Sequence, residues 1–208
     1  MSLLRRMIAP FLPAPRVSTD AEILAVEREI ELDEVPVWVL RARQWVGQGH
    51  YCLGSGGKDP RALSPWTKCA KPKIHSHAAL GARFSDCSGF VDFCLGWDRN
   101  DPVYGWRYCD SLFADAKKQV PGDLGYEVPI ISVRVGDIVV YRSKDIDGDG
   151  DRDIIGHIGI VDFVPTDGPV TWRTIRVIHC SSRPVGDPAV KRTDGRLWEK
   201  TGVVFRVR

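Results

Sequence analysis

The chain has 208 residues, of which 43% are hydrophobic and 27% are charged, so the composition excludes wholesale disorder and suits a single domain. Lys and Arg total 29 against 27 Asp and Glu, and this balance, with no basic stripe interleaved with aromatic residues, argues against a nucleic-acid partner. No apolar run is long enough to span a bilayer, and the N-terminal residues lack the apolar core and small-residue cleavage site of a signal peptide.

The N-terminal residues differ in composition from the rest of the chain. Residues 1–18 are rich in Pro and Arg, and we expect them to form an arm that precedes a single domain over residues 19–208. A helix is predicted to begin at Thr19 and Asp20, because these capping residues are followed by an acidic first turn.

A second helix and a long loop are predicted next. After Pro36, apolar residues in the stretch VWVLRARQWVG recur at i, i+3, i+4 and i+7, which predicts a helix that ends at Gly47. Residues 54–83 are full of Gly, Pro, Lys and His, and this composition indicates a long loop inserted into the domain.

The stretch FSDCSGFVDFCLG, residues 84–96, places a cysteine where a helix begins. Ser85 or Asp86 can cap this helix, and Gly96 can end it. Four apolar residues can share its buried face: Phe90, Val91, Cys94 and Leu95. The sequence therefore predicts that Cys87 lies in the first turn of a helix.

The pattern changes after Pro129. A helix is predicted over residues 111–119, before this point. Beyond it, four short segments are rich in β-branched residues and separated by turn residues: 137–142, 157–164, 174–181 and 202–207. Helices come first and strands second, without βαβ alternation, so we predict an α+β fold with N-terminal helices packed on an antiparallel β-sheet.

The position of Cys87 suits a nucleophile. Thiolate is the reactive form of cysteine, and the unpaired N–H groups at a helix N-terminus favour negative charge, so a first-turn cysteine has a lowered pKa. The small residues Ser88 and Gly89 leave room for a carbonyl group to approach. A cysteine near a helix cap is nevertheless more often structural, so the functional interpretation needs a partner for the thiol.

Two histidines can supply the base that such a thiol needs. His157 opens one predicted strand, and His179 lies late in another. Neighbouring antiparallel strands can bring the two side chains together, and a helix packed on that sheet would place Cys87 above them. The order of one cysteine on a helix and two histidines on strands favours a catalytic site over three unrelated residues.

The motifs DCSGFVDFCLG, VGDIVVY, GHIGIV and VIHCSS resemble those of the NlpC-type cell-wall cysteine peptidases, a papain-like group. The resemblance covers roughly Trp45 to the C-terminus. It implies a papain-like fold in which Cys87 is the nucleophile, His157 the base and His179 the residue that orients the base. It also implies a tyrosine upstream that supports the oxyanion, and Tyr51 in HYCLGSGG takes that place, although the family usually has a shorter connection to the cysteine.

The resemblance implies hydrolysis of an amide bond in a peptidoglycan stem peptide, through a thioester acyl-enzyme and without a required cofactor. A wall hydrolase must reach the wall, so we expect export or delivery by a route other than a signal peptide. The enzymatic alternatives are a CHAP-type amidase and a thiol acyltransferase on a similar scaffold, which differ in the motif around the cysteine. The alternative from another class is a module that binds a peptide or calcium without turnover.

The stretch KDIDGDGDRDIIG, residues 144–156, is an acidic loop between two predicted strands. Aspartates occupy alternate positions in it: Asp145, Asp147, Asp149, Asp151 and Asp153. Carboxylates spaced in this way can converge on calcium, and Gly150 falls where an EF-hand loop has its glycine. The twelfth position is Gly156 instead of Glu, so the bidentate ligand is missing. Two interpretations remain, a calcium site and a solvated acidic hairpin tip.

The six cysteines do not form a recognisable disulfide framework, although a single bridge between Cys52 and Cys69 is compatible with the sequence. These two cysteines, with His75 and His77, also offer four soft ligands for zinc. Their spacing fits no common zinc pattern, so we interpret the segment as a solvated loop instead. Cys94 is predicted to be a buried core residue. Cys180 follows His179, so it should point to the opposite face of its strand, and we assign it no catalytic role.

Overall fold

The computed structural model of the chain describes residues 35–71, 83–101, 105–106, 108–118, 124–147, 149–150, 154–182 and 188–208. The described residues belong to one unit, Val35–Arg208. The predicted N-terminal arm and the helix expected to begin at Thr19 lie outside the described residues.

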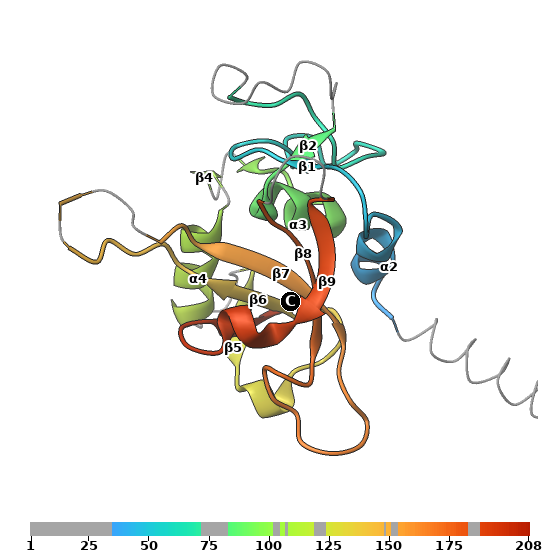
Figure 1. Cartoon of the computed structure of the whole chain (residues 1–208), viewed down its shortest axis with the longest axis vertical. Helices are drawn as coiled ribbons and strands as arrows, with labels where there is room; N and C mark the ends of the chain where they lie inside the picture. The colour runs from blue at the N-terminus through green and yellow to red at the C-terminus, as the bar shows by residue number, and fades with distance from the viewer. Residues whose placement is uncertain are drawn as a thin grey trace, which may run out of the picture. The chain divides into compact units, whose positions relative to one another are not determined.

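A six-stranded antiparallel sheet lies at the centre of this unit, in the order β5-β10-β6-β7-β8-β9 (Figure 1). Its strands are β5 (Gly125–Val128), β6 (Ile138–Tyr141), β7 (His157–Phe163), β8 (Arg176–Cys180), β9 (Val190–Asp194) and β10 (Val203–Val207). The predicted α+β class with an antiparallel sheet is confirmed. The four predicted strands are the four inner ones. The two that the β-branched pattern did not indicate, β5 and β9, are the edge strands, which tolerate polar residues.

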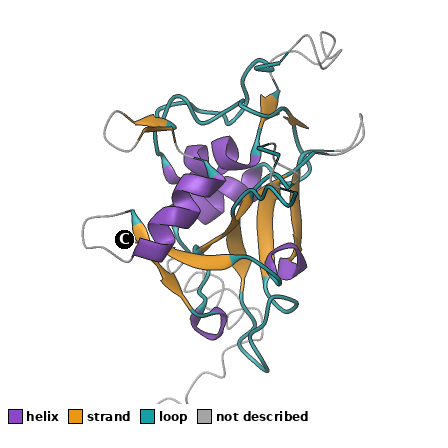
Figure 2. Ribbon diagram, turned by 90° about the vertical axis from the view of Figure 1, so that its left-hand side faces the viewer, coloured by secondary structure: helices purple, strands orange, loops and turns teal. Residues whose placement is uncertain are grey.

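In the part of the chain that the structure describes, three α-helices lie beside the sheet (Figure 2): α2 (Val37–Gln44), α3 (Cys87–Leu95) and α4 (Cys109–Lys118). Two short 3-10 helices are η2 (Ile130–Ser132) and η3 (Gly195–Trp198). Helix α3 packs on β7 and β8, α4 packs on β5, β6 and β10, and α2 contacts α3 and β7. Helix α4 begins at Cys109, two residues before the predicted start. Among the described residues, no helix has the length and apolar character that crossing a membrane requires.

Two apolar clusters cover opposite faces of the sheet. On the helix side, Phe90 of α3 packs with Ile158 and Ile160 of β7. On the other side, Val161 packs in a cluster around the fully buried Trp198 of η3. This division follows from the alternation of side chains along a strand, which places neighbouring residues of β7 on different faces.

Two short parallel strands, β1 (His50–Tyr51) and β2 (Phe84–Ser85), join the two ends of the predicted loop. Over residues 54–71 the loop forms no helix or strand apart from an isolated bridge between Thr67 and Phe84. A disulfide between Cys52 and Cys69 closes this part of the loop. A small hairpin follows α3 and consists of β3 (Asn100–Asp101) and β4 (Gly105–Trp106).

Candidate active site

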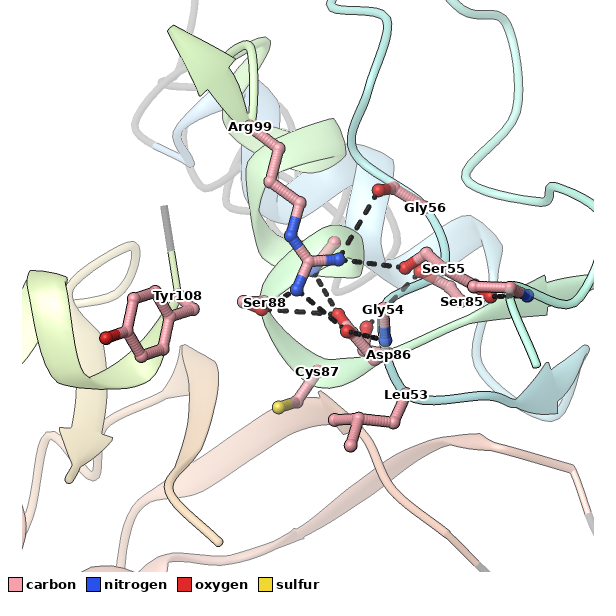
Figure 3. A network of polar contacts seen from close by, with 12 residues as sticks. Leu53, Gly54, Ser55, Gly56, Ser85, Asp86, Cys87, Ser88, Arg99 and Tyr108 are labelled. Carbon is pink, nitrogen blue, oxygen red and sulfur yellow. Dashed lines mark hydrogen bonds and ion pairs between the residues drawn. The ribbon is translucent and has the colours of Figure 1, made fainter. Parts of the chain in front are cut away.

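Cys87 is the first residue of α3, as predicted. Asp86 caps the helix, because its Oδ1 accepts a hydrogen bond from the Gly89 N–H at 2.7 Å. Figure 3 shows the Cys87 sulfur pointing away from the polar contacts of Asp86, between Leu53 and Tyr108. The side chain is only 3% exposed but borders a cavity, so the thiol is shielded from bulk water and still faces open space.

His157 and His179 form a hydrogen-bonded pair, as the sequence predicts. His157 is the first residue of β7, and its Nε2 lies 2.8 Å from Nδ1 of His179 on the neighbouring strand β8. The other nitrogen of His179, Nε2, is 3.1 Å from the hydroxyl of Thr193 on β9. Both imidazoles are buried. The chain of contacts holds the ring of His157 in one orientation.

The two imidazoles lie on the face of the sheet opposite α3. They pack against Trp198, whose ring centroid is 5.5 Å from that of His157 and 5.4 Å from that of His179. The expectation that α3 would place Cys87 above the sheet face carrying both histidines is therefore wrong. Cys87 instead lies at the N-terminal end of β7, where its sulfur is 4.0 Å from the carbonyl oxygen of Gly156, the residue before His157.

The surroundings of Cys87 favour the thiolate. Its sulfur lies 3.7 Å from the sulfur of Cys109, and the hydrogen bond between the two is the largest influence that lowers the pKa of the Cys87 thiol, to about 5. Burial acts in the opposite direction, while the hydrogen bond and positive charge of His157 lower this pKa further. These influences together favour the ionised form of Cys87.

Tyr51 lies near the nucleophile although a long loop separates the two in the sequence. The parallel pairing of β1 with β2 sets Tyr51 opposite Ser85, two residues before Cys87. Burial, followed by the negative charge of Cys87, raises the pKa of the Tyr51 phenol well above its usual value. The hydroxyl therefore keeps its proton and can serve as a hydrogen-bond donor at this site.

Two cavities adjoin the reacting pair. One holds about 450 Å³ and is lined in part by Cys87, Ser88, Tyr108 and Cys109. The other holds about 800 Å³ and is lined in part by Tyr51, His157, His179 and Thr193. Three residues border both cavities: Leu53, Ile155 and Gly156. The two cavities therefore share a boundary next to Cys87 and His157.

A buried ion pair fixes the segment in front of the nucleophile (Figure 3). Arg99 Nη2 lies 2.7 Å from Asp86 Oδ2 and 2.7 Å from the Ser88 hydroxyl, and both charged side chains are almost fully buried. The same Asp86 oxygen accepts a hydrogen bond from the Gly54 N–H at 2.7 Å. Arg99 also donates to the carbonyl oxygen of Ser55 at 3.1 Å. These contacts join the loop that follows Tyr51 to the first turn of α3.

The sequence patterns did not single out two residues of this site. No motif or periodicity marks Arg99, so its role could be seen only from its contacts. Cys109 is the first residue of a helix, as Cys87 is, and this position could have marked it as a candidate site residue. It was missed because the helix was predicted to begin at Ser111, two residues later.

The acidic loop brings three carboxylates together. Ligand oxygens of Asp145, Asp147 and Asp149 lie within 4.8 Å of one another, and all three side chains are exposed. The Gly150 N–H donates to Asp145 Oδ2 at 3.0 Å. The remaining two aspartates, Asp151 and Asp153, lie outside the described residues. Calcium binding by this loop stays a prediction.

Thermal unfolding provides a test of that prediction. If the loop binds calcium in the folded state, millimolar calcium should raise the unfolding midpoint of the full chain relative to a sample with chelator, because a ligand that binds only the folded state stabilises it. A variant with Asp145→Asn and Asp147→Asn should lose the shift. Equal midpoints for wild-type protein with calcium and with chelator would leave the solvated hairpin tip as the interpretation.

The remaining cysteines occupy structural positions. The disulfide between Cys52 and Cys69 removes both residues from the zinc alternative. His75 and His77 lie outside the described residues. Cys94 and Cys180 are fully buried in the helix-side cluster, which fits the predicted core position of Cys94 and the predicted orientation of Cys180 away from the face of His179.

A scan against protein-family models, a search of the curated proteins and a search of the solved structures returned no match to this chain. The functional assignment therefore rests on the motifs and on the geometry of the site.

Proposed function

We propose that this protein is a cysteine peptidase or amidase with a papain-like fold that hydrolyses an amide bond in peptidoglycan stem peptides. The observation that carries the proposal is the placement of one thiol beside a histidine pair. The Cys87 sulfur at the start of α3 lies 4.0 Å from the carbonyl oxygen of Gly156, the residue before His157, and His157 is held at 2.8 Å by His179. A nucleophile, a base and an orienting group gathered in one place are the parts that covalent acyl transfer requires.

The first half of the reaction forms the acyl-enzyme. The Cys87 thiolate attacks the amide carbonyl carbon, and the carbonyl oxygen becomes an oxyanion. The backbone N–H of Cys87 or Ser88 and the Tyr51 hydroxyl are the donors for this charge. His157, protonated while it faces the thiolate, gives its proton to the amide nitrogen. The carbon–nitrogen bond then breaks, the amine leaves, and a thioester links the acyl group to Cys87.

The second half releases the product. Water attacks the thioester carbon while His157 takes a proton from it, so the base regains the proton that it gave to the amine. The carbon–sulfur bond breaks, the carboxylic acid leaves, and Cys87 returns to thiolate. His157 Nε2 is occupied by His179, so Nδ1 is the nitrogen that exchanges protons in both halves.

The substrate class is supported by the resemblance of DCSGF, GHIGIV and VIH to the cell-wall peptidases. It is also supported by the two cavities beside the reacting pair, which suit a branched or extended peptide. The acyltransferase alternative uses the same thioester with an amine in place of water. The non-catalytic alternative is less favoured, because it leaves the lowered pKa of Cys87 without a function.

Digestion of defined muropeptides by the full chain, with mass spectrometry of the products, tests the proposal. Cleavage of one amide bond should yield two fragments whose summed mass exceeds that of the substrate by one water. Protein alkylated at Cys87 serves as the inactive control. Muropeptides that stay intact with stoichiometric protein and long incubation would overturn the proposal. Fragments joined to an added amine would favour the acyltransferase.

A further inference from the structure

A second thiol contacts the nucleophile, and the mechanism above leaves it unused. Cys109 is the first residue of α4, and its sulfur lies 3.7 Å from that of Cys87, within the range of a hydrogen bond between sulfur atoms. Both side chains are buried, and both border the smaller cavity. Neither cysteine takes part in a disulfide.

We propose that Cys109 is a further catalytic residue, whose S–H donates a hydrogen bond to the Cys87 thiolate and so maintains the attacking form of the nucleophile. The catalytic part of this inference rests on the proposed function, whereas the hydrogen bond itself does not. A neighbouring thiol stabilises a thiolate in the same way in other dithiol sites.

The two thiols share one negative charge. Two like charges this close in a buried site repel each other, so the pair loses one proton readily and the second only with difficulty. The charge resides on Cys87, because the positive charge of His157 favours the thiolate at that sulfur. Cys109 has an acidic neighbour in Asp110 instead. Accordingly, the hydrogen bond to Cys87, followed by burial, raises the pKa of Cys109 well above the usual range and keeps it protonated as the donor.

Contacts at the start of α4 hold Cys109 in this place. Asp110 Oδ1 accepts a hydrogen bond from the Ser143 N–H at 2.6 Å, and the Ser143 hydroxyl accepts one from the Gly156 N–H at 2.9 Å. A Cβ atom on Gly156 would lie 2.9 Å from the Cβ of Cys109, so glycine permits this close approach. The helix carrying the donor is therefore tied to the strand end that carries His157.

Other groups around Cys87 do not replace this donor. The titratable groups come from β1, the cap of α3, α4, β6, β7 and β8: Tyr51, Asp86, Cys109, Tyr141, His157 and Cys180. Asp86 disfavours the thiolate, and its charge is paired with Arg99. The pKa values of Tyr51, Tyr141 and Cys180 are raised, above all by burial, so these groups stay neutral. Cys109 and His157 remain as the groups that favour the charge.

The pH dependence of Cys87 alkylation by iodoacetamide tests the inference on the full chain, with peptide mass spectrometry to locate the label. Cys109→Ala and Cys109→Val both lack a donor. In each, the Cys87 alkylation rate at about pH 6 should fall about tenfold relative to wild type, the effect of a pKa rise of about two units from the wild-type value of about 5. The rates should converge above about pH 9. Cys109→Ser keeps a donor and should stay close to wild type. Cys94→Ala, which removes another buried thiol of α3, should match wild type throughout.

Alkylation profiles of both non-donor variants that superimpose on the wild-type profile would overturn the inference. A Cys109→Ser profile that falls as far as that of Cys109→Ala would also overturn it, because the effect would then come from packing. Thermal melts identify the variants that fold, and only their alkylation profiles are compared. If Cys109→Ala does not fold, Cys109→Val takes its place. Alkylation needs no substrate, so its outcome is independent of muropeptide cleavage. If the alkylation profiles follow the expectation but the muropeptides stay intact, the result would count against the peptidase activity and not against the hydrogen bond from Cys109.

Discussion

Replacing Cys87 by alanine is expected to abolish muropeptide cleavage, with turnover lower by about 10⁴-fold or more. The substitution removes the sulfur that forms the thioester in the proposed mechanism. His157 and Tyr51 can polarise groups around the substrate, but neither is placed to supply a second nucleophile in the same geometry. The rate of fragment formation, measured by mass spectrometry per mole of folded protein, gives the size of the loss.

Cys94→Ala is the matched control for this experiment. It removes a fully buried thiol from the same helix, two turns farther along, without touching the reacting pair. We expect it to keep the turnover of wild-type protein, and both variants should show the circular dichroism spectrum of wild type. Cleavage by Cys87→Ala at the wild-type rate would remove Cys87 from the mechanism.

Replacing Arg99 by methionine should have the largest effect on stability, with a loss of about 3 kcal/mol in the free energy of unfolding. The substitution leaves the Asp86 carboxylate, 1% exposed, without its cation. Asp86 keeps hydrogen bonds from the N–H groups of Gly54 and Gly89. Because these bonds still stabilise its charge, we expect a loss of stability at the lower end of the range for broken buried ion pairs. Urea denaturation of both proteins measures the difference.

Two comparisons separate the buried charge from other effects of the Arg99 substitution. Arg173 pairs with Glu199 on the surface, where its side chain is 65% exposed, so Arg173→Met should change stability by less than about 1 kcal/mol. The double variant Arg99→Met with Asp86→Asn carries no unpaired charge and should be more stable than Arg99→Met alone. An Arg99→Met variant as stable as wild type would show that the ion pair does not hold this segment.

Local patterns were sufficient to predict most of the secondary structure around the site. The cap, apolar face and terminal glycine of α3 lie within thirteen consecutive residues, 84–96, and each acts through contacts along a single helix. The inner strands β6, β7, β8 and β10 were predicted because they are buried and so require β-branched residues. The edge strand β9, with the sequence VKRTD, has no such requirement and was missed.

The sequence by itself therefore determined the candidate nucleophile, both histidines and the α+β class, because each has a local signature. Only the tertiary structure decided which groups meet. It set Tyr51 beside Ser85 across the long loop, tied Asp86 to Arg99, placed the sulfur of Cys109 against Cys87, and brought Cys87 to Gly156, the residue before His157. These contacts join residues from different elements. They depend on how helices and strands pack, which no short stretch of sequence encodes.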